Sequence, residues 1–211
     1  MAPARILDGM TETSPRPSGT GPSLPAWRQD LAAALHRNRA DPGSRYLQLA
    51  TVRADGVPAN RTLVFRGFEA HSGALYMVSD ERSAKPAELR AEPRAAIAWY
   101  FSKTREQFRL TGTVTCVLPT DGAAALADCQ RKWNSLSPAA RSQYFWPEPG
   151  TPLAAQAPPT GQPPIEAPPP WFLVLTMAVT EVDHLDLRPS PQRRRHYLLQ
   201  DGAWQAAEIN P

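Results

Sequence analysis

The sequence predicts a mainly β fold, an antiparallel barrel of short strands with a few helices packed outside it. Short runs of β-branched, aromatic and aliphatic residues recur along the chain, and turn signals such as Asp55-Gly56 and Asp201-Gly202 separate them. The chain has 211 residues, 42% of them hydrophobic, which suits one domain with a substantial core. We therefore expect a single domain over residues 25–211.

The N-terminal part is expected to hold a tail and then a helix. Residues 1–24 are rich in Pro, Ser, Thr and Gly, and this composition is typical of a disordered tail. Pro25 suits the first turn of a helix, and Trp27 and Leu31 then begin an apolar stripe at helical spacing. This helix is expected to end at about residue 38 and to pack by its Trp-Leu stripe.

Strand patterns follow in quick succession. Their period-two alternation and the Gly-containing turns between them predict that consecutive strands pair in antiparallel fashion. The expected strands cover residues 46–52, 61–68, 74–78, 95–101, 107–117, 171–179, 180–187, 196–199 and 203–209. Further helices are expected from Ser83 to about Pro93, from Asp121 to about Trp133, and from Ser137 onward.

A proline-rich segment interrupts the pattern at residues 147–170. It contains ten prolines, too many for a helix or a sheet, so we expect an extended loop with polyproline II character. Four aromatic residues near this loop either roof a site or anchor the loop. They are Trp133, Tyr144, Phe145 and Trp146.

Charge and composition exclude several classes of function. A net charge of +3 is well short of the dense basic stripe that nucleic acid requires, and Arg193-Arg194-Arg195 has no aromatic stacking platform. The longest apolar run, residues 171–175, is too short to cross a bilayer, so a cytoplasmic location with no membrane partner is expected.

The titratable residues do not form a hydrolytic or metal site. Cys116 and Cys129 lack the spacing of metal ligands, and no paired carboxylates or nucleophile with a base can be identified. His184 and His196 are either proton carriers or structural residues. No metal is therefore expected.

Cationic and hydroxyl residues gather around the ends of the predicted strands. A phosphate prefers this mixture, because cations supply charge while hydroxyls and backbone N–H groups bind the remaining lone pairs. Ser83 and Lys85 also stand at the start of a predicted helix, whose dipole attracts anions. The alternative is that these are solvated strand ends and a capping serine. The residues are Arg61, Thr62, Arg66, Ser79, Ser83, Lys85, Arg105 and Gln107.

Three motifs in order resemble a known family. SDERSAKPAEL, EPRAAIAWYF and REQFRLTG are similar to segments of the pyridoxamine 5'-phosphate oxidase family, the FMN-binding split barrels. Together with FWPEPG, REQFRLTG is also similar to a bacterial subfamily described only as FMN-binding. The likeness extends from about Arg45 to the C-terminus. It implies an antiparallel split β-barrel that binds FMN.

The resemblance also implies a role for each matching residue. Arg61 would bind the FMN phosphate together with Ser83 and Lys85, and Arg66 would lie between cofactor and substrate phosphate. Arg195 would lie near the flavin, so Arg66 and Arg195 are the expected catalytic residues. The full cofactor set implied by the family is Arg61, Thr62, Leu63, Val64, Phe65, Arg66, Val78, Ser79, Ser83, Lys85, Gln107 and Arg195. The family's ligands come from two subunits, which implies a homodimer with FMN at the interface.

Some positions depart from the family pattern. Ala84 stands where many oxidases have an arginine, and Leu136 stands where an arginine holds the substrate phosphate. Leu185 replaces a flavin-side tryptophan, and the family's C-terminal Arg-x-His substrate motif is not clearly matched in RPSPQRRRHY. These departures make FMN binding better supported than pyridoxamine phosphate as the substrate.

Three functions remain open from the sequence. The first is an FMN-dependent oxidoreductase that transfers a hydride from a small amine or alcohol, similar to pyridoxamine phosphate, to FMN with O2 as acceptor. The second is an NAD(P)H-dependent FMN reductase or electron carrier on the same fold. The third is a non-catalytic module whose basic groups hold another anion.

Overall fold

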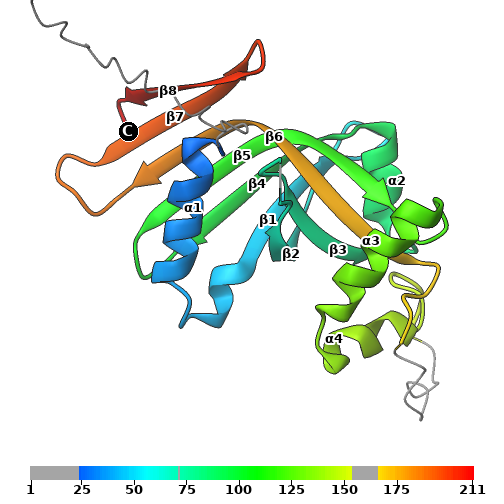
Figure 1. Cartoon of the computed structure of the whole chain (residues 1–211). Coiled ribbons are helices and arrows are strands. Elements are labelled where there is room, and N and C mark those ends of the chain that lie inside the picture. The colour runs from blue at the N-terminus through cyan, green and yellow to red at the C-terminus, as the bar shows by residue number, and fades with distance from the viewer. Residues whose placement is uncertain (1–23, 71, 154–165) are drawn as a thin grey trace, which may run out of the picture.

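The strands close into a barrel, as the alternation predicts. The computed structural model describes residues 24–70, 72–153 and 166–211. Its strands run in the order β3-β2-β1-β4-β5-β6-β7-β8, and β6 also pairs with β3, so that β1 to β6 form a closed antiparallel barrel (Figure 1). They are β1 Tyr46–Val52, β2 Pro58–Phe68, β3 Leu75–Asp80, β4 Arg94–Phe101, β5 Glu106–Val117, β6 Phe172–Asp186, β7 Arg193–Gln200 and β8 Ala203–Ile209.

Strand β6 joins the barrel to a C-terminal hairpin. The two strands expected at 171–179 and 180–187 are in fact this one long strand, and that prediction was wrong. The register shifts where the two patterns meet, because Gly112 pairs with Val179 and Thr111 pairs with Glu181, leaving Thr180 as a β-bulge. Before the bulge β6 pairs with β3, and after it β6 pairs with β7. The hairpin β7–β8 therefore extends away from the barrel (Figure 1).

The inward-facing residues of the strands form the main core. Alternation along β4 and β5 buries Trp99, Phe101 and Phe108, whose rings contact one another, and Phe65 of β2 packs on Trp99. Burial of such aromatic side chains is the largest contribution to the stability of a core of this kind. The barrel interior is therefore filled by side chains, and any ligand site has to lie outside it.

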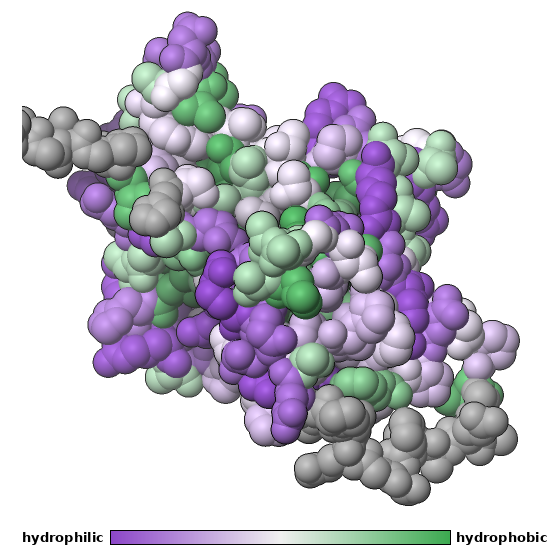
Figure 2. Space-filling view, turned by 45° about the vertical axis from the view of Figure 1, so that its right-hand side comes forward, coloured by the Kyte–Doolittle hydropathy of each residue, from purple (hydrophilic) through white to green (hydrophobic). Residues whose placement is uncertain are grey.

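Helices cover the outside of the barrel and its ends (Figure 1). The α-helices are α1 Ala26–Arg37, α2 Ala84–Ala91, α3 Ala123–Asn134 and α4 Pro138–Ser142, and the 3-10 helices are η1 Pro42–Arg45 and η2 Gln143–Phe145. A second apolar cluster, formed mainly by Trp133, Tyr144 and Phe172, packs α3 and η2 against the start of β6. Figure 2 shows apolar and polar residues interspersed over this side of the molecule.

A polar network fixes α1 to the barrel and to the hairpin. Arg37 of α1 donates to Glu106 of β5 at 2.7 Å, and His184 of β6 lies 3.2 Å from the same carboxylate. Burial would raise the pKa of Glu106, but hydrogen bonds, His184 foremost, outweigh it and lower that pKa to about 2. Nearby, Asp30 of α1 accepts from the Tyr197 hydroxyl at 2.5 Å and from Arg195 at 3.2 Å.

Several element boundaries differ from the sequence expectations. Helix α3 begins at Ala123, because the Asp121 carboxylate instead accepts from the backbone N–H of Leu118 at 2.8 Å. Residues 147–153 and 166–170 form no helix or strand, as expected for the proline-rich loop. The rest of that loop and the predicted N-terminal tail, apart from residue 24, lie outside the described residues.

Candidate functional site

A cavity of about 280 Å³ lies on the outer side of β2 and β3, and the segment from α4 onward forms its far wall. Six of the residues that the sequence assigns to the cofactor line it together. They are Thr62, Leu63, Val64 and Arg66 of β2 with Val78 and Ser79 of β3. The remaining lining residues are Asp80, Ala140, Gln143, Tyr144 and Pro149. Tyr144 therefore forms part of a wall of this cavity.

A cationic cluster adjoins this cavity through Ser79. Lys85 Nζ donates to Ser79 Oγ at 2.9 Å and to Ser83 Oγ at 2.7 Å. Burial lowers the pKa of Lys85, and the neighbouring positive charge of Arg61 lowers it further. Ser83 precedes α2 but does not cap it, because its Oγ donates to the Asp80 carbonyl at 2.7 Å. Ser83 and Lys85, two of the three predicted phosphate-binding residues, are thus brought together with Ser79, and the third, Arg61, is close enough to affect the charge of Lys85.

Arg61 is held by two residues of other elements. Its Nη2 donates to Glu88 Oε2 of α2 at 2.7 Å, and its Nη1 donates to the Thr51 hydroxyl of β1. Thr51 in turn donates to Glu88 Oε2 at 2.6 Å. Burial would raise the pKa of Glu88, but the hydrogen bonds from Thr51 and Arg61 outweigh it and the pKa is lowered. Neither partner could be identified from the sequence, since both come from separate elements.

A β-bulge sets the position of Arg66. Phe65 pairs with Met77 and Gly67 pairs with Tyr76, so Arg66 between them has no partner on β3. A bulge of this kind redirects a side chain, and Arg66 lines the cavity with a buried Nε that has no hydrogen-bond partner among the described residues. Gly67 is required here, because a Cβ would lie 2.6 Å from the Tyr76 ring.

Arg82 holds the segment that forms the far wall of the cavity. It pairs with Asp80 at 2.6 Å, donates to the carbonyls of Tyr144 at 3.2 Å and Trp146 at 3.4 Å, and lies over the ring of Trp171. Burial raises the pKa of Tyr144 and keeps its hydroxyl neutral, although the nearby Arg66 opposes the shift. Sequence reasoning missed Asp80 and Arg82. The signal available was an acidic residue at the end of β3 and a basic residue in the turn that follows.

Three predicted residues do not reach this cavity within one chain. Phe65 points into the barrel core, with 5% of its surface exposed. Gln107 lies on β5, which β1 and β4 separate from β2. Arg195 pairs across the ladder with His184 and points toward Asp30 of α1.

The outer face of the sheet connects the cavity to the C-terminal hairpin. Cross-strand partners point to the same face, and the register aligns one row from the cavity residue to β7. That row is Thr62, Gln48, Ala98, Arg109, Asp183 and His196. Gln107 and Arg194 follow one step along the same face, since both pair with Leu185. Arg194-Arg195-His196 therefore contains an Arg-x-His spacing on the face of Gln107, which the sequence analysis did not identify.

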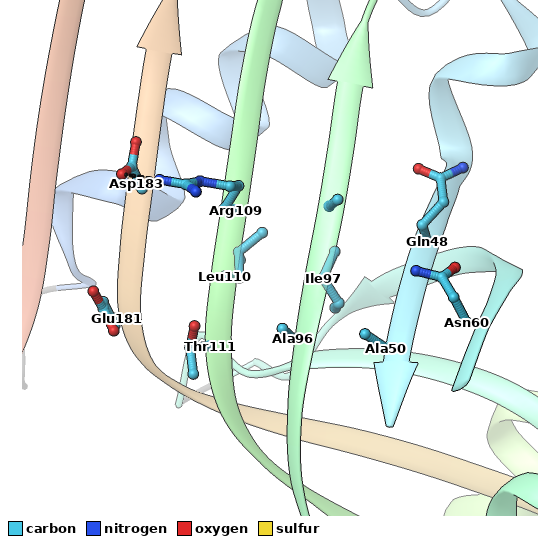
Figure 3. Close-up of a pocket in the computed structure, with 11 residues that line it drawn as sticks. Gln48, Ala50, Asn60, Ala96, Ile97, Arg109, Leu110, Thr111, Glu181 and Asp183 are labelled. Atoms are coloured by element: carbon cyan, nitrogen blue, oxygen red, sulfur yellow. Dashed lines mark hydrogen bonds and ion pairs between the residues drawn. The ribbon is translucent and has the colours of Figure 1, made fainter. Parts of the chain in front are cut away.

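A second, shallow cavity of about 310 Å³ lies in the middle of this outer face (Figure 3). Its floor includes Ala50 and Ala96, while Figure 3 shows Arg109 reaching from β5 toward Asp183 on β6. Asp183 also accepts from Arg194 at 2.6 Å. Burial would raise the pKa of Asp183, but these two arginines lower it. The Asp183 carboxylate is therefore already paired. The small side chains of Ala50 and Ala96 leave the space of the cavity.

The described residues show no metal site or membrane span. No group of three or more His, Cys, Asp or Glu side chains within them is arranged to hold an ion. Both cysteines are free thiols, and burial raises the pKa of Cys129 to about 11, which keeps that thiol protonated. None of the helices in this part of the chain is long and apolar enough to cross a bilayer.

Comparison with known proteins identifies the family. Residues 24–118 match the model of the pyridoxamine 5'-phosphate oxidase FMN-binding domain. The Arabidopsis thaliana protein called pyridoxine/pyridoxamine 5'-phosphate oxidase 2 is 32% identical over 198 residues, which cover 90% of this chain and 100% of that protein.

Solved structures agree with this match. A pyridoxamine 5'-phosphate oxidase-related, FMN-binding protein from Nostoc punctiforme PCC 73102 is 44% identical with a TM-score of 0.85, over 90% of this chain and 100% of that one. PhzG from Burkholderia lata 383 shares the fold, with a TM-score of 0.69 at 17% identity over 92% of this chain and 100% of that one. The chain therefore belongs to the pyridoxamine 5'-phosphate oxidase family of FMN-binding split barrels, and FMN is its cofactor.

Proposed function

We propose that this chain is an FMN-dependent oxidase that takes a hydride from a pyridoxamine phosphate-like amine or alcohol, with O2 as the acceptor. The observation that carries the proposal is the bulge at Arg66. It brings Arg66, whose buried Nε has no partner among the described residues, into the same cavity that the cofactor residues line. A buried donor of this kind is stabilised by an anionic ligand.

The residues around the cavity fit FMN. Arg61, Lys85, Ser79 and Ser83 form a cationic, hydroxyl-rich cluster suited to a phosphate, and Ser79 connects it to the cavity. Arg61 and Arg66 lie five residues apart on β2, roughly 16 Å along a strand. That separation leaves room for a phosphate at one end and a flat ring at the other.

The chemistry divides between cofactor and protein. When bound, FMN supplies the acceptor for the hydride from the substrate carbon, and O2 then takes up both electrons. Arg66 binds the anionic group of the substrate and so orients the reacting carbon. The Tyr144 hydroxyl stays neutral beside it, and the segment held by Arg82 covers the cavity and excludes water.

A second copy of the chain is proposed to complete the site. Gln107, Arg194 and His196 share the outer face with the cavity residue Thr62 but lie several strands away from it. A homodimer that packs these outer faces together brings the C-terminal hairpin of one chain to the cavity of the other. On this geometry Arg194 and His196 contact the substrate, whereas Arg195 remains paired with Asp30 of its own chain.

A second candidate is a reductase or electron carrier that uses NAD(P)H. The wall formed by Ala140, Gln143, Tyr144 and Pro149 carries no positive charge, and Leu136 is buried in the second apolar cluster. Within one chain, Arg66 is thus the cation of the cavity lining available for a substrate phosphate. A cavity that binds a phosphorylated substrate only weakly favours the reductase or electron carrier.

An anaerobic titration of the FMN-loaded protein distinguishes the candidates. Flavin absorbance that bleaches on addition of pyridoxamine or pyridoxine 5'-phosphate and returns with air supports the oxidase. Flavin that bleaches only with NADPH refutes the oxidase and supports the reductase. If the protein binds FMN but neither donor bleaches it, the catalytic proposals fail and a non-catalytic module remains. Arg66→Gln serves as the control, with an expected loss of substrate affinity while FMN stays bound.

A further inference from the structure

Glu88 occupies an unusual place in the phosphate cluster. Its side chain is only 11% exposed, yet it is a carboxylate that contacts the arginine expected to bind a phosphate. Arg61, Thr51 and Glu88 form a closed ring of hydrogen bonds, in which Glu88 Oε2 accepts from both of the others. An anion of the protein itself therefore lies against the anion-binding arginine.

This carboxylate balances two cations that repel each other. Arg61 disfavours the charged form of Lys85, whereas Glu88 and Asp80 favour it. Asp80 is already paired with Arg82, whereas Glu88 pairs directly with Arg61 and also favours the charged form of Lys85. Arg61, Lys85 and Glu88 together carry one net positive charge, and Arg53 adds a further positive charge near Glu88.

We propose that Glu88 is a built-in counter-anion, which steadies Arg61 in the absence of FMN and competes with the FMN phosphate for its charge. The inference rests on the proposed position of the phosphate beside Arg61 and Lys85. Its consequence is an FMN site of reduced affinity, from which the cofactor exchanges readily.

The test compares FMN with riboflavin, which lacks the phosphate, by fluorescence titration of the apoprotein. Glu88→Gln keeps the size of the side chain and an oxygen that accepts from Arg61, but removes the negative charge. We expect FMN to bind on the order of tenfold more tightly, since a like charge near the phosphate is lost. Riboflavin affinity stays unchanged, and the melting temperature of the apoprotein falls.

Glu92→Gln is the matched control. Glu92 is a carboxylate paired with Arg94 at the other end of α2, so its loss removes the same charge and leaves both affinities unchanged. Glu88→Ala is the second variant, because it also removes the hydrogen bond to Arg61. A higher preference for FMN over riboflavin in both Glu88 variants supports the proposal. If the preference is unchanged in Glu88→Gln and lower in Glu88→Ala, Glu88 only positions Arg61 and the proposal is overturned.

The wild-type protein separates this inference from the proposed site. If wild type binds FMN and riboflavin equally well, the phosphate does not contact this cluster, and both the site and the role of Glu88 are refuted. If wild type prefers FMN but Glu88→Gln does not strengthen that preference, only the role of Glu88 is refuted.

Discussion

Replacing Arg82 with alanine tests whether this residue holds the far wall of the cavity in place. The change removes an ion pair with Asp80, two hydrogen bonds to backbone carbonyls and the stacking on Trp171. The paired side chains are 24% and 15% exposed, so solvent screens them less than a surface pair. A hydrogen bond to a charged group contributes about 1.5–3 kcal/mol, and the two carbonyl contacts are long and weaker. We therefore expect Arg82→Ala to lower the free energy of unfolding by about 2–3 kcal/mol.

The same substitution affects the cofactor. Asp80 lines the cavity, and without Arg82 its charge is uncompensated next to the expected phosphate site, so FMN affinity falls. Urea unfolding of the apoprotein and an FMN titration measure the two effects. The double variant Asp80→Asn with Arg82→Ala is the control, because it removes the orphaned charge and regains most of the FMN affinity. A single variant within about 0.5 kcal/mol of wild type, with unchanged FMN affinity, refutes the role of Arg82.

Three further predictions concern the dimer, pH and packing. Arg66→Ala and Arg194→Ala are each expected to be inactive, but mixed subunits regain about a quarter of the wild-type turnover, because half of the dimers then hold one intact site. No recovery after mixing by refolding, with dimers confirmed by light scattering, contradicts the shared site. The lowered pKa of Glu106 contributes stability that is complete above its ordinary value of 4.5 and is lost as pH falls toward 2. Urea unfolding from pH 6 to 2 should show this loss in wild type, and a Glu106→Gln variant with the same pH slope contradicts it. Gly112→Ala should destabilise by about 1–3 kcal/mol or more in urea unfolding, because its Cβ would lie 2.1 Å from the Ala178 carbonyl oxygen, and wild-type stability refutes that clash.

Local sequence patterns predicted the strands of the barrel, because the alternation of apolar and polar residues is contained within each strand. The inward side chains of β4 and β5 follow period two without interruption, and these two strands are found where the pattern predicts them. The alternation of side chains does not predict where a β-bulge occurs. The alternation through β6 breaks at Thr180, and an isolated sequence cannot distinguish a break between two strands from one extra residue within a single strand.

The candidate site was predictable only in part for a related reason. Ser79, Ser83 and Lys85 lie at the end of β3 or just after it, so they are close in sequence and were assigned together, whereas Arg61 of β2 was assigned to the phosphate through the family resemblance. Glu88 and Arg82 remained hidden, because their roles depend on contacts between separate elements. The choice between Arg194 and Arg195 depends on cross-strand register, which places adjacent residues on opposite faces of a sheet.

The path of β6 divides the β-sheet into a closed barrel and a C-terminal hairpin. The segment matched by the family model, residues 24–118, contains β1 to β5 and the predicted phosphate-binding residues, and it ends before β6 begins. The hairpin β7–β8 pairs with the barrel sheet only through the second half of β6, and it also contacts α1, where Tyr197 bonds to Asp30 and Trp204 packs on Trp27. Barrel closure depends on the pairing of β3 with the first half of β6 and does not involve the hairpin. Exchanging the hairpin together with the α1 residues that contact it is therefore expected to leave the barrel closed.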